Sequence, residues 1–471
     1  MPTYKSPDVY VEEISVFPPS VAEVETAIPA FIGYSQTARK TADNDLLLKP
    51  TKIYSLKEFE VYYGLPKNEA IAVTVSDDGA GGFKVDAFTV NTVSGDPLPS
   101  YLLYYSVKMF FDNGGGQCYI VSVGNYAASV DLGAGAGTGL QDGLDAVALE
   151  DEPTLIVIPE AVKLSAADYQ TLVQAVLDQC NRLKDRFGIF DLRDGGTDLD
   201  AAALSANRGY FGNNYLKYGA VYYPFVKTAM NYPVADDESS VSVTYGATTA
   251  ALSAFSATGA SPNTAIHNFV KSALKDHFVK VPPSGAVTGV YAATDTNRGV
   301  WKAPANVSLA DVLEPLVKLD NAHQDGLNVD ATTGKSINAI RAFAGKGTLV
   351  WGARTLAGND NEWRYVSVRR FFNMVEESVK KSTYWAVFEP NDANTWVKVR
   401  GMIENYLTQK WREGALAGAT TKDAFFVRCG LGTTMTAQDI LEGTMNVEIG
   451  MAVVRPAEFI ILKFSHKLQT S

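Results

Sequence analysis

The most regular alternation of apolar and polar residues lies near the C-terminus, in the run MNVEIGMAVVRPAEFIILKF at residues 445–464. Side chains of an extended segment point alternately to opposite faces, so a period of two indicates strands. The run therefore predicts a hairpin of two strands, 445–454 and 457–464, separated by the break Arg455-Pro456. The apolar positions on the faces of these strands are Val447, Ile449, Met451, Val453, Phe459 and Ile461.

A two-stranded hairpin is only marginally stable in water, so the predicted hairpin needs further strands. The N-terminal run SPDVYVEEISV offers one, with Val9 and Val11 between polar neighbours. Terminal strands without a local partner suit strand addition between copies of the chain, and a head-to-tail exchange that does not close builds a filament. The alternative is a sheet within one chain that joins both termini, and composition alone favours that alternative.

The middle of the chain alternates apolar, strand-like runs with amphipathic helices. Two capping patterns, Ser55 with Glu58 and Ser165 with Asp168, open helices in this part. The alternation predicts a mixed α/β fold (α+β mixed) of several domains, with helix-covered mixed sheets, a C-terminal α/β domain and extended terminal β-arms that pair between subunits. Buried strands are expected at residues 27–35, 117–123, 154–160, 187–193 and 218–224.

Two stretches interrupt this pattern. Residues 71–90 form two β-type runs around the turn sequence DDGAGG, and residues 236–263 are rich in small side chains. We expect both as insertions on the outer surface. The predicted organisation is an N-terminal arm at 1–26, an outer α/β region at 27–300 with insertions near 66–100 and 228–263, and an inner domain at 301–471, joined in one alternative by part of 27–45.

The alternation restarts in the C-terminal block. GTLVWGART and TYWAVFEP are expected strands on either side of a helix, VSVRRFFNMVEESVKKS. A second helix is expected to begin near Asp392, and Thr436 with Asp439 caps a short helix before the terminal strands. This block is therefore expected to have its own core.

Charge is unevenly distributed along the 471 residues, whose formal net charge is −11. Residues 337–471 contain 17 Lys and Arg against 13 Asp and Glu, a net of +4, and residues 1–336 carry the remaining −15. A basic block in an acidic chain suggests a surface that faces an acidic partner. Nucleic acid is not expected as that partner, because no dense Lys/Arg stripe with interleaved aromatic residues occurs.

No run of the sequence has the length and apolar character of a membrane span, and the start MPTYKSPDVY lacks the pattern of a signal peptide. We therefore expect synthesis in the cytoplasm and no direct insertion into a membrane.

Motifs for catalysis fail on their spacing. TTGKS at residues 332–336 ends like a phosphate-binding loop, but the position of its first glycine holds Val329. GAGAGTG at residues 133–139 lacks the GxGxxG spacing and is expected to be a linker. The four histidines and three cysteines lie far apart, without metal-binding spacing. No catalytic residue, cofactor or metal is expected, and an α/β enzyme with a degenerate phosphate loop remains an alternative.

Several segments resemble the contractile tail sheath proteins of myophages and related contractile injection systems. The resemblance covers nearly the whole chain in order, and departs from it at the two insertions. It implies a structural subunit that forms stacked hexameric rings around an inner tube and contracts to drive the tube through a target cell envelope. The segments include SPDVYVEEIS, FFDNGGGQCYIV, NRGVWKAPAN, VWGARTL, EWRYVSVRR, WREGALAGAT and VEIGMAVVRPAEFIILKF.

The same resemblance implies the partners: other copies of the chain, an inner tube protein, and baseplate and terminal cap proteins of a phage tail or tail-like particle. In that family the C-terminal domain lines the lumen, so basic residues of the helix at 366–382 are candidates for contacting an acidic tube. The alternative is that they pair with Glu376, Glu377 or other acids of their own subunit. A non-contractile capsid or surface-layer protein is a further alternative. The tube-facing candidates are Arg369, Arg370, Lys380 and Lys381.

Overall fold

The structure is a computed structural model that describes residues 20–94, 97–133, 135 and 137–461. The chain divides into two compact units. Of the described residues, the small unit contains 20–24 and 375–454, and the large unit contains the others. The predicted domain boundary at residue 300 lies inside the large unit. Strands on both sides of it, β9 (Gly219–Tyr223) and β16 (Asn338–Phe343), pair with each other there.

The large unit is built on a mixed sheet whose described part has nine strands. Six consecutive strands of this sheet are parallel to one another. The three outer strands, β14 and β17 at one edge and β2 at the other, pair antiparallel. The order across the sheet is β14 (Val307–Ser308), β17 (Gly347–Val350), β16 (Asn338–Phe343), β9 (Gly219–Tyr223), β8 (Phe187–Asp191), β7 (Leu155–Val157), β1 (Pro29–Ser35), β6 (Cys118–Asn125) and β2 (Thr51–Ile53).

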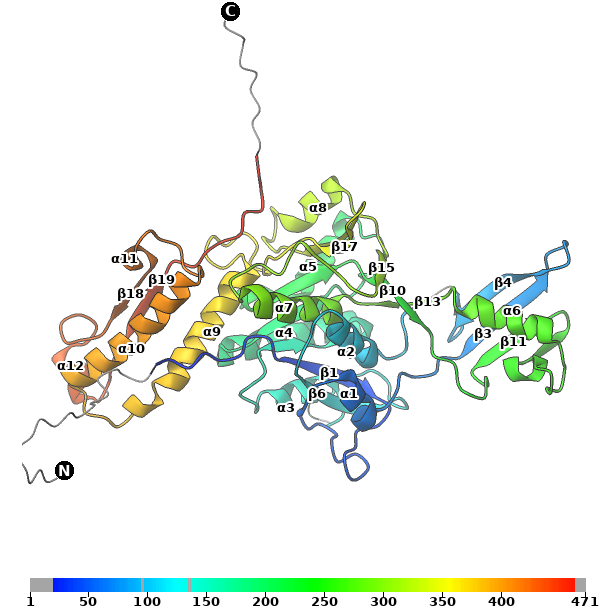
Figure 1. Ribbon diagram of the computed structural model, residues 1–471, viewed down its shortest axis with the longest axis horizontal. Helices are drawn as coiled ribbons and strands as arrows, with labels where there is room; N and C mark the ends of the chain where they lie inside the picture. The colour runs from blue at the N-terminus through cyan, green and yellow to red at the C-terminus, as the bar shows by residue number, and fades with distance from the viewer. Residues whose placement is uncertain (1–19, 95–96, 134, 136, 462–471) are drawn as a thin grey trace, which may run out of the picture. The chain divides into compact units, whose positions relative to one another are not determined.

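Helices cover both faces of this sheet, as the sequence predicts (Figure 1). The central strand β1 is buried along its whole length, and its side chains alternate between two hydrophobic clusters. Phe31 packs in the cluster of α2 and α7, whereas Ala30 and Ile32 pack in the cluster of α3 and α4. The helices on the two faces are α1 (Leu56–Tyr63), α2 (Leu103–Asp112) and α7 (Ser284–Arg298), and α3 (Leu140–Val147), α4 (Ala166–Leu183) and α5 (Ala201–Tyr210).

The two predicted insertions meet in one sheet. The predicted hairpin at residues 71–90 is present, and one of its strands pairs in parallel with a strand of the second insertion. Helix α6 (Thr264–Leu274) contributes Ile266 and Val270 to the apolar cluster beside this sheet. The strand order is β12 (Thr248–Ala251), β11 (Val241–Tyr245), β3 (Ile71–Asp77), β4 (Phe83–Val90) and β5 (Val93–Ser94).

The remaining elements of the large unit are short. A three-stranded antiparallel sheet has the order β13 (Phe278–Val281), β10 (Val226–Asn231) and β15 (Val312–Pro315). The other pieces are α8 (Asn321–Asn328) and the 3₁₀ turns η1 (Pro159–Lys163), η2 (Leu216–Tyr218) and η3 (Leu252–Phe255).

The small unit packs α10 against a two-stranded sheet. Asp392 caps α10 by accepting hydrogen bonds from the backbone N–H groups of Asn394 and Thr395. Thr436 and Asp439 form the predicted capping box of α12. The elements are the second half of α9 (Val366–Ser382), η4 (Tyr384–Ala386), α10 (Ala393–Arg412), α11 (Thr421–Ala424), β18 (Phe425–Arg428), α12 (Ala437–Leu441) and β19 (Glu448–Met451).

The strand predicted at TYWAVFEP is wrong. This segment is the η4 turn followed by a loop, in which Phe388 is fully exposed and has a φ of +68°. A positive φ is incompatible with an extended strand. A short apolar run bounded by polar residues fits a strand or a loop equally well by periodicity, and here the chain reverses between two helices.

A buried carboxylate connects β1 with α2 in the core of the large unit. Glu160, at the turn after β7, accepts hydrogen bonds through Oε1 from the backbone N–H groups of Leu102 and Leu103, at 2.9 and 2.8 Å. It thereby caps α2, whose own N-cap residue offers no side-chain acceptor. Burial raises the pKa of Glu160 to about 7. A Cβ on Gly33 of β1 would lie 2.3 Å from Oε2 of Glu160, so only glycine leaves room for this carboxylate.

We expect Gly33→Ala to destabilise the large unit, because the added methyl group must displace either the strand or the capping carboxylate. Overpacking of this kind costs about 1–3 kcal/mol. Urea unfolding of dilute, unassembled protein would measure the change. The control is Gly209→Ala in α5, where a Cβ meets nothing within 4 Å and stability should stay the same or rise slightly. Equal unfolding midpoints for Gly33→Ala and the parent would contradict the close packing.

Candidate inter-subunit interface

The sheet of the small unit consists of β18 and β19 alone among the described residues. They pair antiparallel, with Phe425 opposite Met451 and Val427 opposite Ile449. The chain after β19 continues this pairing with one bridge, between Leu416 and Val453. The sheet therefore has two outer edges that no further strand of the described chain covers along β18 and β19.

The predicted alternation along the first terminal strand is confirmed. The four apolar positions are half-buried, and Asn446, Glu448 and Ala452 between them are exposed. The predicted hairpin partner is wrong, because β19 pairs with β18 and residues 457–461 form no strand. The carboxylate of Glu458 is instead bound by Arg354 in the large unit, so the segment does not fold back on β19. The half-buried positions are Val447, Ile449, Met451 and Val453.

Large apolar side chains are exposed much more densely in the small unit than in the large one. Seven of them lie in residues 375–454, whereas residues 25–374, a segment more than four times as long, expose eight. Beyond β19, Phe459, Ile460 and Ile461 are exposed in succession. Concentrated exposure of apolar side chains is typical of surfaces that contact another chain. The seven are Tyr384, Val387, Phe388, Val397, Phe426, Leu431 and Leu441.

The described chain begins next to the small unit. The backbone N–H groups of Ala22 and Val24 donate to the hydroxyls of Ser382 and Ser378 on α9, at 3.0 and 3.1 Å. Glu23 forms an ion pair with Lys410 of α10, whose side chain is buried. These contacts fix the point from which the preceding residues leave. The predicted arm positions Val9 and Val11 lie outside the described residues, so their pairing stays a prediction.

The expected outward orientation of Arg369 and Arg370 is wrong. Their exposed fractions are 2% and 4%. The guanidinium of Arg369 lies 4.4 Å from the ring centroid of Trp363, and that of Arg370 donates to Oδ1 of Asp295 at 3.0 Å. Both arginines therefore hold the large unit together from within. Arg370 pairs with an acid of its own subunit, as the alternative anticipates, whereas Arg369 packs against an aromatic ring.

Lys380 and Lys381 lie in the last turn of α9, in the small unit, and are only partly buried. Both form ion pairs with Glu377, at 3.1 and 3.3 Å. These two lysines remain candidates for contact with an acidic partner.

Comparison with known proteins decides the family. The model of the phage tail sheath protein central domain matches residues 133–356, and that of the phage tail sheath C-terminal domain matches residues 358–467. The sheath of an extracellular contractile injection system, solved as the PVC sheath complex in the contracted state, is 30% identical, with a TM-score of 0.66 over 99% of both chains. The chain belongs to the phage tail sheath family.

Other members of the sheath family agree in fold and in sequence. The helical sheath of the anti-feeding prophage in its contracted state is 30% identical, with a TM-score of 0.64 over 99% of this chain and 100% of that one. The tail sheath protein of Vibrio phage KVP40 is 30% identical over 131 residues, which are 27% of this chain. The aligned part spans only 19% of that larger relative, so likeness to it concerns one segment.

The phosphate-loop alternative fails in this sheath protein on geometry. The ammonium group of Lys335 in TTGKS is turned inward and donates to the backbone carbonyl of Arg208, at 3.1 Å. Burial lowers the pKa of Lys335. The hydroxyl of Ser336 donates to the carbonyl of Asn328, at 2.6 Å. Both side chains are therefore engaged with the fold and do not face a ligand.

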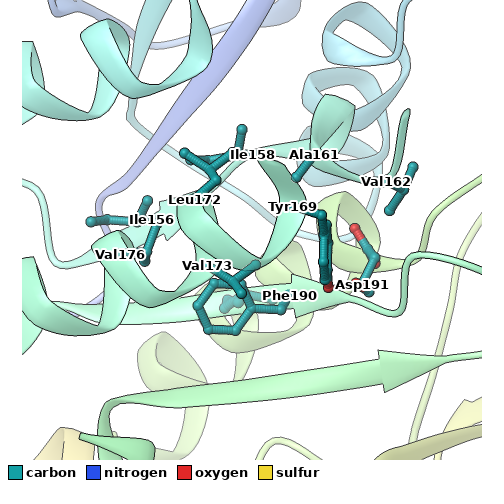
Figure 2. Close-up of a pocket in the computed structure, with 11 residues that line it drawn as sticks. Ile156, Ile158, Ala161, Val162, Tyr169, Leu172, Val173, Val176, Phe190 and Asp191 are labelled. Atoms are coloured by element: carbon teal, nitrogen blue, oxygen red, sulfur yellow. Dashed lines mark hydrogen bonds between the residues drawn. The ribbon is translucent and has the colours of Figure 1, made fainter. Parts of the chain in front are cut away.

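A pocket between α4 and the strands β7 and β8 is lined mainly by apolar side chains (Figure 2). Its polar groups belong to Tyr169 and Asp191. The tyrosine hydroxyl donates to the backbone carbonyl of Asp191, at 2.6 Å, and the aspartate carboxylate accepts from the backbone N–H of Ser284, at 2.8 Å, at the start of α7. Burial raises the pKa of Asp191 to about 7. These bonds connect elements of the core, and the pocket offers no nucleophile beside a base.

Two further searches of the described residues bear on partners. They contain no group of three or more His, Cys, Asp or Glu side chains arranged to hold a metal ion. None of the helices in these residues combines the length and the apolar character needed to cross a bilayer.

We expect Ile461→Asp to leave the unassembled chain as stable as the parent and to prevent its polymerisation. Ile461 is 80% exposed, so a carboxylate there stays hydrated in the free chain. Burying it without a partner in a neighbour's sheet costs on the order of several kcal/mol. Thermal unfolding and sedimentation velocity measure the two effects.

The matched control for Ile461→Asp is Leu149→Asp, the same kind of change at an 88% exposed apolar side chain of the large unit. This control should polymerise as the parent does. Identical sedimentation of the two variants would exclude residue 461 from the interface.

Proposed function

We propose that the chain is the structural subunit of a contractile sheath, in a phage tail or a phage-tail-like particle. Copies polymerise as stacked hexameric rings around an inner tube, and contraction of the sheath drives the tube through a target cell envelope. The observation that carries this proposal is the two-stranded sheet of β18 and β19, whose outer edges pair with no further strand among the described residues. Its partners are other copies, the inner tube protein, and baseplate and terminal cap proteins.

Strand addition supplies the physical basis of polymerisation. An edge strand presents unpaired backbone N–H and C=O groups, and an extended segment from another chain can satisfy them. The N-terminal arm with Val9 and Val11 and the C-terminal segment with Phe459 and Ile461 are the segments available for exchange. Because donor and acceptor surfaces differ, the contact is head-to-tail and extends through many copies.

The two units have different roles in this proposal. The small unit, with its dense exposed apolar side chains, forms the connected inner layer of the sheath. The five-stranded sheet made from the two insertions faces outward and is free to differ between relatives. In this proposal the inner layer consists of residues 375–454 together with both arms. The inner domain predicted from the sequence, 301–471, is larger on its N-terminal side.

Contraction in this scheme needs no nucleotide. The subunits change from one packing to another as rigid bodies, and the arms keep neighbours connected while the contacts between rings are replaced. The change runs downhill because the contracted packing buries more complementary surface. The subunit acts mechanically and catalyses no reaction, in accord with the inward orientation of Lys335.

Negative-stain electron microscopy of the purified protein tests the proposal. Hollow striated tubes or cogwheel-shaped rings are expected. Flat lattices or closed shells would favour a surface-layer or capsid protein. A shift of the melting temperature on addition of nucleoside triphosphates would favour an enzyme.

Removal of Met1–Phe17 should leave a folded subunit that forms no sheath, because this arm is expected to add a strand to a neighbour and little to its own core. The contacts of residues 22–24 with α9 and α10 are retained in this truncation. Circular dichroism reports the fold, and microscopy reports assembly. Tubes of normal length from the truncated chain would exclude exchange of the N-terminal arm.

Lys380 and Lys381 are proposed to contact the tube before contraction. Exposed ion pairs are worth about 0 to 1 kcal/mol each and are weakened by salt. Weak contacts of this kind suit a tube that must be released, and their repetition in every ring still sets the register. Glu377 pairs with both lysines and so reduces the positive charge that they can offer to the tube. The contact should therefore be examined at low ionic strength, where screening is weakest.

Neutralising both residues, as Lys380→Gln with Lys381→Gln, should reduce assembly of extended sheath on tubes at low salt. Neutral replacements are preferable to glutamate, because two new carboxylates beside the buried Glu377 would endanger folding. The control is Lys398→Gln with Lys422→Gln, which removes the same charge at exposed positions of the same unit. Equal co-assembly of both double variants, across low and moderate salt, would show that this turn of α9 does not face the tube.

A further inference from the structure

Arg354 is a buried cation in the large unit, with an exposed side-chain fraction of 4%. It follows β17 and lies in the segment VWGARTL. Burying a guanidinium without a counter-charge is strongly unfavourable, so its partners matter. The carboxylate that forms its ion pair comes from Glu458, more than 100 residues further along the chain and seven residues after β19 ends.

Several contacts that do not involve Glu458 hold Arg354 in place. Asn338 of β16 accepts a hydrogen bond from the backbone N–H of Arg354 and donates to its carbonyl, both at 2.8 Å. Nη1 of Arg354 donates to the backbone carbonyls of Asn328, at the end of α8, and of Gly358, at 3.3 and 3.4 Å. The backbone of Arg354 and one nitrogen of its guanidinium are therefore fixed by residues other than Glu458.

Glu458 occupies the remaining edge of the guanidinium. Nε of Arg354 donates to Oε1 and Oε2 of Glu458, at 2.9 and 3.2 Å, and Nη2 donates to Oε2. Two parallel bonds from a planar guanidinium fix both the position and the orientation of a carboxylate. The Glu458 side chain is 19% exposed, so water only partly screens the pair.

The place of Glu458 in the chain gives this ion pair its significance. Val454, the last residue of the small unit, donates its backbone N–H to the carbonyl of Ala415. Four residues later the chain is bound at Glu458, and immediately beyond it Phe459, Ile460 and Ile461 are exposed. Among the described residues, Glu458 is therefore the last one in the C-terminal segment whose side chain forms an ion pair.

We propose that Arg354 and Glu458 form an anchor that fixes the position and register in which the C-terminal arm, residues 459–461 and onward, leaves the subunit. The proposal rests on the proposed function, in which this arm pairs with a neighbouring copy. A slip of one residue moves every side chain of a strand to its opposite face. Because Glu458 is bound in one orientation, it would set which face of a neighbour's sheet Phe459 and Ile461 meet when the arm pairs there as a strand.

The N-terminal segment is held by a contact of the same kind. Glu23 is bound to Lys410, a cation of α10 that is buried in the small unit, and Lys410 is also paired with Glu413 at 2.7 Å. Each arm thus has a glutamate near its exit point, paired with a buried cation. The same arrangement at both arms is what an anchoring role requires, since each arm must leave from a defined place.

Limited chymotrypsin digestion of the unassembled, full-length chain tests the anchor. Cleavage after Phe459 requires several residues on both sides to enter the protease, and therefore requires Glu458 to leave Arg354. Glu458→Gln removes the charge and one acceptor oxygen while keeping the length of the side chain. We expect cleavage after Phe459, followed by mass spectrometry, to become at least about tenfold faster, which corresponds to about 1.4 kcal/mol.

The control variant is Glu448→Gln. Glu448 of β19 belongs to another Arg–Glu pair, with Arg428 at 3.5 Å, in which both side chains are more than half exposed. Its neutralisation should leave cleavage after Phe459 unchanged. Arg354→Lys keeps the charge of the site but removes the two parallel bonds, so it should release the arm as Glu458→Gln does.

Cleavage after Phe388, in the fully exposed loop after η4, serves as an internal reference. Unchanged cleavage after Phe459 in Glu458→Gln would overturn the anchor. An equal rise at Phe388 would also overturn it, because the ion pair would then support the fold in general and not the arm in particular.

Assembly of the same variants separates this proposal from the function on which it rests. If the parent forms tubes, Glu458→Gln should form few or short ones, and tubes of normal length and yield would overturn the role in register. If the parent forms no tubes, the proposed function fails, and the digestion still decides whether Arg354 and Glu458 hold the arm.

Discussion

Every backbone N–H and C=O group of a strand needs a hydrogen-bond partner, and an edge strand turns half of these groups outward. This constraint separates the two units. In the large unit, β1 has a strand on each side and helices on both faces, so its polar backbone and its apolar side chains are satisfied within the chain. In the small unit, β18 and β19 are both edge strands, and a sheet of two strands is marginal in isolation. The small unit is incomplete in a way that another copy can correct.

The exposed apolar side chains follow the same division. They are dense in the small unit and along residues 459–461, and sparse in the large unit. A monomer with such a surface is held in solution by its charge and is drawn toward association. Open strand edges give that association a direction, because backbone hydrogen bonds form only in a defined register. In the proposed assembly, apolar contact would supply most of the driving force, and the strand edges would set the geometry.

Local patterns in the sequence predicted local structure well. The caps at Ser55, Ser165 and Asp392 mark true helix starts, since a side-chain oxygen that satisfies the first N–H groups is a local interaction. The buried strand at 27–35 and the hairpin at 71–90 are also where periodicity places them. The alternation of the terminal runs also indicated strands without a full local sheet, and β19 lies in a sheet of two strands among the described residues.

Partner choice between distant segments could not be predicted in the same way. The alternation from Val447 to Val453 fixes a face but not the strand across from it, and β18 competes for that place with residues 457–461. In the structure β18 takes that place, and Glu458 of the competing segment is bound by Arg354, more than 100 residues earlier. Resemblance to the sheath family supplied the architecture, whereas this pairing needed the three-dimensional structure.

The charge of the C-terminal block shows how burial changes the meaning of a count. Of its 17 basic residues at least four are buried in the described structure, and of its 13 acidic residues Glu377 is buried. Most of the excess of +4 is therefore neutralised or enclosed within the subunit, where these cations bind Asp295, Glu458, Glu23 and aromatic rings. An attraction to an acidic tube cannot rest on the net charge of the block. The proposed attraction would have to come from particular partly exposed cations, and Lys380 and Lys381 are the pair proposed for it. The buried cations are Arg354, Arg369, Arg370 and Lys410. Arg354 binds Glu458 and Lys410 binds Glu23, and each glutamate lies beside an arm. In the anchor proposal, part of the basic character of this block therefore serves to hold the arms in place.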